Sequence, residues 1–597
     1  MRKVTTLLML SIVFGLFILV GCSQEMKWDH STEYLFEWER ADEPLAYSES
    51  YYNLKLKEEY ADYTGVITLP YRQGRSYNLA VYMSLHNDSG NAVECIQIPD
   101  GYQKIFVSNP DGTIRQIKIF KTDLGTSYWG RSLNSLFSSD FIILGRVESF
   151  AIENEDKKLE GQGYYIVGDC LYYTHPAVYN NNFYGGYQYS FFVKAPCTVK
   201  GSYTVPEYVE AYTNTAFEDP AVPVVGIGAA AFFGCSEITN IAIPDSVTYI
   251  GDYAFAGCTG LTSITIPESV TSIGSHAFDG CTGLTSITIP ESVTDIGDHA
   301  FAGCTNLKSV TIYGAIESIG IQVFSGCTGL TSIVIPESVT TIDGAAFLNC
   351  SELKSISIPD LVTKIGNAAF MGCSGLTSIS LPDAIETIGN SAFSGCSGLS
   401  SITIPASIRD IGSDAFSGCS CSIVFADDHT YIPSQALRGA SEITSVTIPD
   451  SVTIIGAEAF MGCSALTTIS LPDSIKTIGN SAFSGCSGLS SITIPASIQN
   501  IGSDAFSGCS CSIVFADGLT SIPSQALCRA EGITSVSIPD SVASICSSAF
   551  SYCSSLTSIA FSGTKAQWDN IDKYYRWRDG VPAESIHCSD GDVSLTN

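Results

Sequence analysis

Residues 261–281 read Leu-Thr-Ser-Ile-Thr-Ile-Pro-Glu-Ser-Val-Thr-Ser-Ile-Gly-Ser-His-Ala-Phe-Asp-Gly-Cys. The first six residues alternate aliphatic and hydroxyl side chains, which is typical of a strand with one buried face. Pro267 ends the strand, because proline cannot donate a hydrogen bond to a ladder. Gly274 permits a tight bend, and Ala277-Phe278 then supply an apolar corner. The stretch therefore predicts a strand, a turn and a short helical corner.

The closing cysteine of this stretch recurs with a period of 23 residues, at Cys235, Cys258, Cys281, Cys304, Cys327, Cys350, Cys373, Cys396, Cys419, Cys463, Cys486, Cys509 and Cys553. Ala440 and Ala530 take the cysteine position in two 21-residue units, which brings the total to about 15 units. The segment 371–460 is also duplicated as 461–550. Such a period predicts a solenoid, in which each unit buries its apolar face against its neighbours. Parallel strands about 4.8 Å apart would form a ladder roughly 65 to 70 Å long.

The full motif is Leu-x-x-Ile-x-Ile-Pro-x-x-Val-x-x-Ile-Gly-x-x-Ala-Phe-x-x-Cys, and it resembles the BspA-like leucine-rich repeat of bacterial and some protist surface proteins. The resemblance covers about residues 223–561. It implies a repeat solenoid of the leucine-rich-repeat horseshoe type, with parallel strands on the concave face and short helical corners on the convex face. It also implies surface display and adhesion. Residues 561–597 resemble the terminal unit of that family, which is expected to cap the last layer.

The N-terminal segment has the pattern of a secretory signal. A basic start is followed by an apolar run, residues 7–20, and then by Gly21 and Cys22. The last four residues of this signal, 19–22, resemble the lipobox of bacterial lipoproteins, in which the cysteine becomes lipidated. We therefore expect residues 1–21 to be a lipoprotein signal peptide and Cys22 to be the lipidation site. An uncleaved membrane anchor is the alternative, since the run is only slightly short for a span of ~20 residues.

The expected product is secreted and lipid-anchored, at the outer membrane or cell surface of a bacterium. Residues 22–45 are polar and acidic enough to form a tether. Residues 46–200 form a Tyr-rich β-domain that resembles no family we recognise, and residues 201–560 hold the repeats. Of the 29 tyrosines, 22 precede residue 213. They are either sheet residues or stacking platforms for sugars.

Short alternating runs in this front part predict strands at 65–69, 78–83 and 114–120. Residues 108–112, Ser-Asn-Pro-Asp-Gly, predict a turn, because proline presets one backbone dihedral and glycine accepts a positive φ. These elements favour an antiparallel β-domain.

The charge balance argues against nucleic acid as a partner. The chain has 29 basic and 60 acidic side chains, a net charge of −31, and only seven basic residues between 201 and 561. The sequence contains no HExxH, GxSxG, Walker or CxxC motif. Residues 226–231 imitate the GxGxxA fingerprint of dinucleotide-binding proteins, but the repeat register already explains each of these residues. We therefore expect no catalytic residue, no metal site and no cofactor, and hence no enzyme.

The in-register cysteines are expected to be buried, reduced and inert. Secretion favours some disulfides among the others, with Cys170–Cys197 and Cys528–Cys546 as candidates. His276 and His299 occupy the same position in adjacent units and should stack, but two ligands alone make a weak metal site. Carboxylates after the proline should form a solvated acidic edge, at Asp245, Glu268, Glu291, Glu337, Asp360, Asp383, Asp450, Asp473 and Asp540.

The outer positions of the strands carry short hydroxyl residues. This predicted ligand-binding row on the concave face consists of Thr265, Thr288, Thr311, Ser357, Ser380, Thr403, Thr447, Ser470, Thr493 and Ser537. A flat row of repeated polar groups suits an extended protein better than a small molecule, which prefers a closed apolar pocket. The hypothesis is an adhesin that binds host matrix proteins or surface proteins of neighbouring cells, with membrane attachment only through Cys22.

Two alternatives remain. A surface glycan-binding or glycan-processing lipoprotein would use the Tyr-rich domain, with the repeats as a spacer. A structural envelope protein would associate with itself through the repeats.

Overall fold

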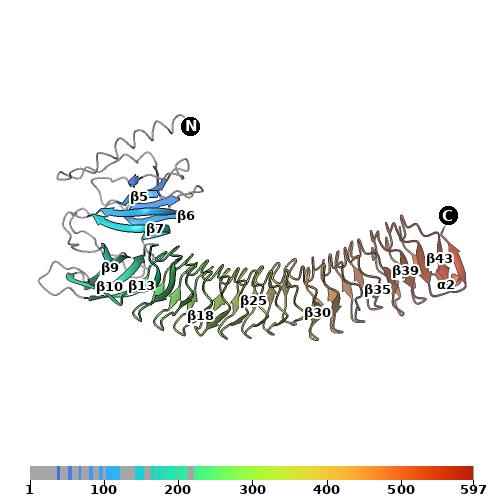
Figure 1. Ribbon diagram of the computed structural model, residues 1–597. Helices are drawn as coiled ribbons and strands as arrows, with labels where there is room; N and C mark the ends of the chain where they lie inside the picture. The colour runs from blue at the N-terminus through green and yellow to red at the C-terminus, as the bar shows by residue number, and fades with distance from the viewer. Residues whose placement is uncertain are drawn as a thin grey trace, which may run out of the picture.

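The computed structural model describes residues 36–40, 52–56, 66–68, 79–84, 93–98, 102–120, 141–153, 163–167, 170–179, 182–195, 198–210 and 221–595. Beyond residue 221 the chain forms a parallel β-solenoid of about 16 turns, as the sequence predicted. Figure 1 shows these layers following one another along a bowed rod, from the green N-terminal layers to the red C-terminal cap.

Nearly every layer contributes one strand to a ladder built from the alternating segment at the start of each repeat, and only the layer at residues 466–471 has no such strand among the described repeats. This long-strand ladder consists of β11 (Gly201–Thr204), β14 (Ile238–Ala242), β16 (Ser263–Ile264), β18 (Ser286–Ile289), β20 (Ser309–Ile312), β22 (Ser332–Val334), β24 (Ser355–Ser357), β26 (Ser378–Ser380), β28 (Ser401–Ile404), β30 (Ser422–Phe425), β32 (Ser445–Thr447), β35 (Ser491–Ile494), β37 (Ser512–Phe515), β39 (Ser535–Ile538), β41 (Ser558–Phe561) and β43 (Ser585–Cys588). Paired neighbours are parallel and in register from one repeat to the next, for example Ser286 with Ser309 and Ile289 with Ile312.

A second ladder of short strands, each of two residues except β13, lies after the turn that follows each long strand. This short-strand ladder consists of β13 (Ala221–Ile227), β15 (Tyr249–Ile250), β17 (Ser272–Ile273), β19 (Asp295–Ile296), β21 (Ser318–Ile319), β23 (Thr341–Ile342), β25 (Lys364–Ile365), β27 (Thr387–Ile388), β29 (Asp410–Ile411), β31 (Tyr431–Ile432), β33 (Ile454–Ile455), β34 (Thr477–Ile478), β36 (Asn500–Ile501), β38 (Ser521–Ile522), β40 (Ser544–Ile545) and β42 (Asp572–Lys573). The isoleucine that ends each strand of this ladder from β13 to β40 is buried in the core. The strand β12 (Tyr208–Glu210) pairs antiparallel with β13.

The corner before each cysteine is a series of turns, so the predicted short helical corners are wrong. Each corner contains two residues with positive φ, such as His276 at 55° and Gly280 at 68°. Positive φ at these two positions breaks the right-handed helical hydrogen-bond pattern. The N–H groups of His276 and Phe278 therefore donate to carbonyls of the next layer, Asp298 and Ala300, at 2.9 and 2.7 Å.

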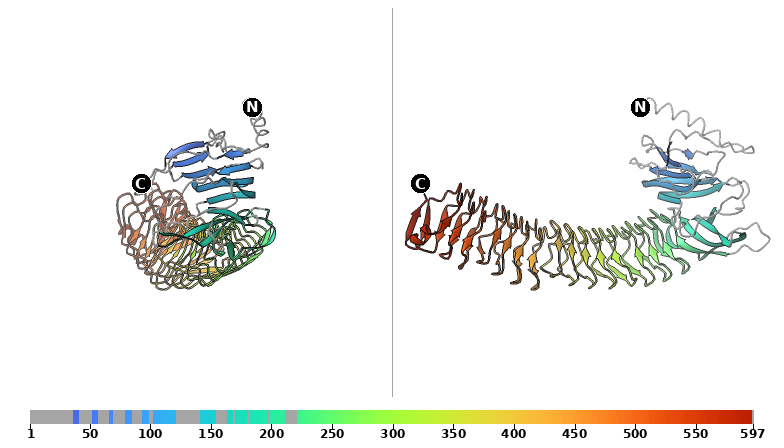
Figure 2. Two further views of the ribbon diagram at one scale, coloured as in Figure 1. Left: turned by 90° about the vertical axis from the view of Figure 1, so that its left-hand side faces the viewer. Right: turned by 180° about the vertical axis from the view of Figure 1, so that it is seen from behind.

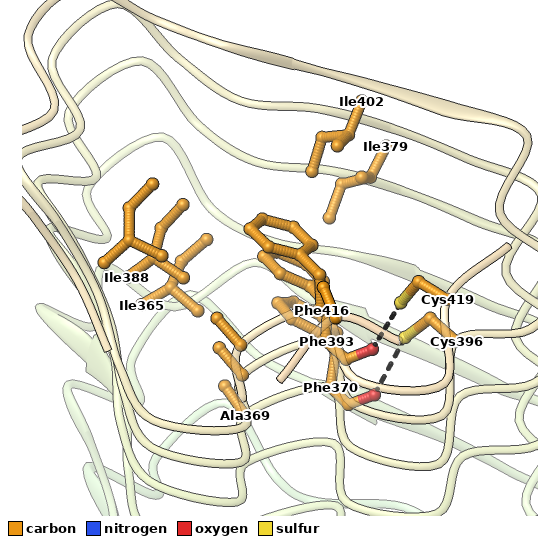
Figure 3. Close-up of a cluster of buried hydrophobic side chains, with 14 of the residues drawn as sticks. Ile365, Ala369, Phe370, Ile379, Ile388, Phe393, Cys396, Ile402, Phe416 and Cys419 are labelled. Carbon is orange, nitrogen blue, oxygen red and sulfur yellow. Dashed lines mark hydrogen bonds between the residues drawn. The ribbon is translucent and has the colours of Figure 1, made fainter. Parts of the chain in front are cut away.

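A stack of phenylalanine rings runs through the middle of the rod. Figure 3 shows Phe370, Phe393 and Phe416 lying one above another between the isoleucines of the two ladders. Neighbouring ring centroids lie 5.4 and 5.6 Å apart in this segment, with nearly parallel planes. The stack is continuous from Phe192 to Phe416, and each of these rings is fully buried.

The cysteines lie beside this stack as buried free thiols. The thiol of Cys396 donates a hydrogen bond to the carbonyl oxygen of Phe370 in the preceding layer, at 3.2 Å, and Cys419 does the same to Phe393 at 3.0 Å (Figure 3). The same bond recurs in twelve layers, from Cys258 to Cys553. Each thiol thus connects its layer to the one before it.

The front strands form a sheet of their own, seen with the rod from two further directions in Figure 2. The strands before the rod are β1 (Phe36–Arg40), β2 (Tyr52–Leu56), β3 (Val66–Thr68), β4 (Leu79–Ser84), β5 (Val93–Ile98), β6 (Tyr102–Phe120), β7 (Phe141–Glu153), β8 (Gly163–Val167), β9 (Cys170–Tyr179) and β10 (Asn182–Lys194). The sheet order is β1-β2-β4-β6-β5-β3, and β7 also pairs with β6.

The strands of this front part lie where the alternation placed them. The expected antiparallel pairing holds for β8–β9 and β9–β10, but in the sheet of β1 to β7 this expectation and the predicted turn are wrong. All pairs in that sheet except β1–β2 are parallel. The prediction failed because an alternation with a period of two indicates a strand but not its direction. The predicted turn at 108–112 lies inside β6. There the register of β6 against β7 shifts between Asn109 and Thr113, so these residues form an irregularity and not a chain reversal.

The rod is continuous with strands that precede residue 201. The end of β10 pairs in parallel with β13, and β8 and β9 extend the same sheet. Phe192 stacks on Phe232 with ring centroids 4.6 Å apart. At the other end β44 (Gly591–Ser594) pairs antiparallel with β43. The short helix α2 (Lys565–Asp569) places the buried Trp568 against this last layer, and Thr564 and Gln567 form its capping box.

Candidate functional site: the hydroxyl face

The long-strand ladder presents the predicted hydroxyl row to solvent. Nine of the ten residues are exposed, and Thr311 is half-buried. Strand pairing sets them side by side, as in Thr288 with Thr311 and Ser357 with Ser380. The intervening side chains, such as Ile287 and Ile289, are buried. The alternation of the sequence therefore predicted the exposed side of this ladder correctly.

A second row, which the sequence prediction omitted, runs beside the first, two residues earlier in each strand. It consists of Asn240, Ser263, Ser286, Ser309, Ser332, Ser355, Ser378, Ser401, Ser422, Ser445, Thr468, Ser491, Ser512, Ser535 and Ser558. The signal that would have found it is the serine before the first isoleucine of nearly every unit. We call the two rows together the hydroxyl face; where the first row lacks a hydroxyl it carries Ala242, Val334, Val424, Val514 and Ala560.

Hydroxyls elsewhere on the rod are used by the fold itself. Thr271 donates to the carbonyl of Thr248 in the preceding layer at 3.1 Å, Thr262 donates to Thr239 at 3.1 Å, and Ser292 donates to Val270 at 2.7 Å. Within residues 221–595, by contrast, the ten hydroxyls of the predicted row make no side-chain hydrogen bond to protein. Their donors and acceptors are available to a ligand.

The hydroxyl face carries no charge, although the rod is strongly acidic. None of its positions from residue 240 to residue 560 holds a charged residue, whereas residues 201–561 contain 31 acidic and seven basic side chains. The predicted acidic edge lies outside this face, and its nine carboxylate residues are exposed. The face is thus a neutral polar strip along an anionic rod.

The buried thiols are poor nucleophiles. Burial raises the pKa of the Cys281, Cys463 and Cys553 thiols to about 12, so they stay protonated near neutral pH. Cys528 and Cys546 are free thiols, so the pairing predicted for them is wrong. Cys22 and the candidate pair Cys170–Cys197 lie outside the residues whose side chains are described.

His276 and His299 stack as expected, with ring centroids 4.3 Å apart, and Tyr253 stacks on His276 at 4.5 Å. The Nδ1 atom of His276 lies 2.9 Å from Oδ2 of Asp279. In the part of the chain that the structure describes, no three His, Cys, Asp or Glu side chains gather as metal ligands. Among the same residues, no helix has the length and apolar character needed to cross a membrane.

These repeats define a bacterial-type leucine-rich-repeat solenoid. The model of the BspA type leucine rich repeat region matches residues 225–354, 340–467 and 453–574 in six copies. The chain therefore belongs to this family, which is typical of bacterial cell-surface proteins, as the sequence predicted.

Solved structures with related sequences are also leucine-rich-repeat proteins. A leucine-rich repeat protein from Bacteroides ovatus is 28% identical, covers 68% of this chain and 99% of its own, and has a TM-score of 0.49. A leucine rich cell surface protein from Faecalibacterium prausnitzii is also 28% identical, covering 70% and 99%, with a TM-score of 0.36. The leucine-rich-repeat protein of T. pallidum is 24% identical, covering 41% and 86%, with a TM-score of 0.26. No curated protein matches the chain.

Proposed function

We propose that the protein is a lipid-anchored surface adhesin whose hydroxyl face binds other proteins. The observation that carries the proposal is the row of hydroxyls that the fold leaves without hydrogen bonds. Such groups repeat along the rod and can each contribute a weak contact to an extended ligand. Affinity then accumulates with the number of layers engaged and with the number of copies on one cell.

The internal duplication supports this choice of face. Between segments 371–460 and 461–550 the first row changes only from Thr447 to Ser537, and Ser380, Thr403 and Val424 recur unchanged as Ser470, Thr493 and Val514. Near the short-strand ladder, exposed or half-buried positions change in character. Glu386, Arg409, Tyr431 and Ile454 correspond to Lys476, Gln499, Ser521 and Ser544. The first row, whose hydroxyls make no hydrogen bond to protein, therefore kept its hydroxyl positions through the duplication.

Host matrix proteins and surface proteins of neighbouring cells are the proposed partners. Because the rod is acidic, it should steer basic stretches of a matrix-protein partner toward itself, and added salt should slow that association. Attachment to the membrane would run through a lipid on Cys22, and the front part of the chain would connect that anchor to the rod.

The test is solid-phase binding of residues 23–597 to immobilised matrix proteins such as fibronectin. One variant replaces Thr288, Ser357, Thr403 and Thr493 by glutamine. The matched control makes the same replacement at four exposed serines outside the hydroxyl face, Ser374, Ser397, Ser420 and Ser487. We expect at least tenfold weaker binding for the first variant and unchanged binding for the second. Equal binding by both would refute this role of the face and favour the glycan-binding alternative in the Tyr-rich domain.

A further inference from the structure

Three valines interrupt the hydroxyl face every four layers, whereas Ala560 lies two layers beyond the last of them. If the layer of Ala242 is counted as the first, Val334 lies in the fifth, Val424 in the ninth and Val514 in the thirteenth. Four layers at about 4.8 Å separate these valines by roughly 19 Å. Val334 is 64% exposed, and Val424 and Val514 are half-buried. A ligand that covers the face should therefore present apolar groups with the same spacing.

Val424 and Val514 share the same surroundings on the hydroxyl face. Val424 lies between Thr403 and Thr447 on the neighbouring strands, and Val514 lies between Thr493 and Ser537. Next to each, two serine hydroxyls of the second row are hydrogen-bonded to one another. These pairs are Ser422 with Ser445 at 2.7 Å and Ser512 with Ser535 at 2.6 Å. The face thus carries repeated, equivalent contact sites.

We propose that the hydroxyl face binds the hydroxyl face of a second copy of this chain, with the two rods antiparallel. A two-fold axis at the layer of Val424 places Val424 opposite its own equivalent. The same axis places Val334 of each copy opposite Val514 of the other, so that all three valines meet valines. The proposal rests on the function proposed above, because it names the partner of the same face.

Charge favours this face for contact between copies. Two rods with 31 acidic and seven basic side chains each repel one another, but the hydroxyl face brings no charges into the contact. Its hydroxyls are donors and acceptors at once, so identical faces can satisfy one another. The antiparallel arrangement also places the two N-terminal ends at opposite ends of the pair, as copies anchored on facing cells require.

The contact area sets the expected strength. A strip roughly 65 to 70 Å long and about 10 Å wide buries about 700 Å² on each copy, or roughly 1,400 Å² in total, within the range of specific interfaces. The bow of the rod in Figure 1 shortens the contact between two rigid copies. We therefore expect weak association in solution, strengthened by display of many copies on one surface.

The experiment immobilises residues 23–597 on beads through the N-terminus and measures bead clumping, together with sedimentation velocity of the free protein. One variant carries V334E, V424E and V514E, and its matched control carries I321E, L361E and I454E, three exposed apolar residues outside the hydroxyl face. We expect beads with the wild type and with the control to clump, and beads with the valine variant to clump at least tenfold less. The melting curves of both variants should be unchanged. Absence of wild-type clumping, or equal clumping of the valine variant, would overturn the proposal.

Two further measurements separate the possible failures. Dyes on the N-terminal amines of associated chains should show little energy transfer, and strong transfer would overturn the antiparallel arrangement. The same proteins are also tested on immobilised fibronectin. Binding to fibronectin that requires the face, without self-association, would overturn the proposed partner and leave the proposed function in place.

Discussion

Phe301→Ala removes one ring from the phenylalanine stack and tests the assignment of the core directly. Phe301 is fully buried, between Phe278 at 5.1 Å and Phe324 at 5.6 Å. Its carbonyl oxygen accepts a hydrogen bond from the Cys327 thiol, and its N–H donates to the carbonyl oxygen of Val323. The backbone bonds survive the substitution, so the loss is that of the ring and its contacts.

The expected cost is about 3 to 5 kcal/mol, the range for a buried phenylalanine replaced by alanine. Two aromatic contacts of about 0.5 to 1.5 kcal/mol each place the value toward the upper end. Thr288→Ala should change stability by less than about 0.5 kcal/mol, because that side chain is exposed and makes no hydrogen bond to protein.

Hydrogen exchange read by mass spectrometry is the appropriate assay, since layers of a solenoid open locally. Opening of the layers around residues 278–324 should accelerate roughly 100- to 3,000-fold in Phe301→Ala, at 1.4 kcal/mol per tenfold. Layers far along the rod should keep wild-type rates. Equal acceleration by Phe301→Ala and Thr288→Ala would refute the register of the repeats.

Further predictions concern the corners, the thiols and the anchor. Gly297→Ala should lower the free energy of unfolding by about 3 kcal/mol, because its Cβ would clash with the backbone nitrogen of Ser275. Gly303→Ala should lower it by only about 1 to 2 kcal/mol, because the new side chain has space and only the φ of 68° is unfavourable. Equal melting temperatures of the two variants would contradict this. Burial raises the pKa of the Cys281, Cys463 and Cys553 thiols to about 12 in the folded state, above the unfolded value. The folded state therefore keeps its full stability below about pH 8.5 and loses stability as pH rises toward 12. The loss is roughly 1.4 kcal/mol per pH unit for each thiol. Urea titrations from pH 8 to 11 measure this loss, and a constant midpoint would contradict it. Cys22→Ser should abolish palmitate labelling and release the protein from membranes, whereas an unlabelled, membrane-bound wild type would contradict the lipoprotein assignment.

The buried and exposed rows of the rod could be predicted from the sequence because both depend on repeat position alone. Ile264, Phe278 and Cys281 recur at fixed offsets, and a parallel in-register stack repeats their environment in every layer. The corner was predicted wrongly because its apolar spacing imitates a helix. Backbone dihedrals decide that point, and a positive φ at His276 is not evident from its side chain.

Other features depend on contacts between layers, which one unit of sequence does not contain. Thr265 and Thr271 are both threonines of the same repeat, yet only Thr271 lies where its hydroxyl reaches a carbonyl of the preceding layer. The neutral hydroxyl face and its valines became visible only when all layers were aligned in space. In the front sheet, strand direction depends on connections, so alternation alone predicted the strands and not their parallel pairing.

The hydrogen bonds between successive layers also govern how the rod responds to mechanical force. If the N-terminal end is anchored and a partner is bound as proposed, a pull between them acts along the rod, across the bonds that hold layer to layer. Loss of one layer replaces about 4.8 Å of rod by 23 residues of extended chain, roughly 75 to 80 Å. A force–extension record should show steps of about this size, one for each layer. The rod would thus lengthen stepwise under load and dissipate the pull before the bond to its partner breaks.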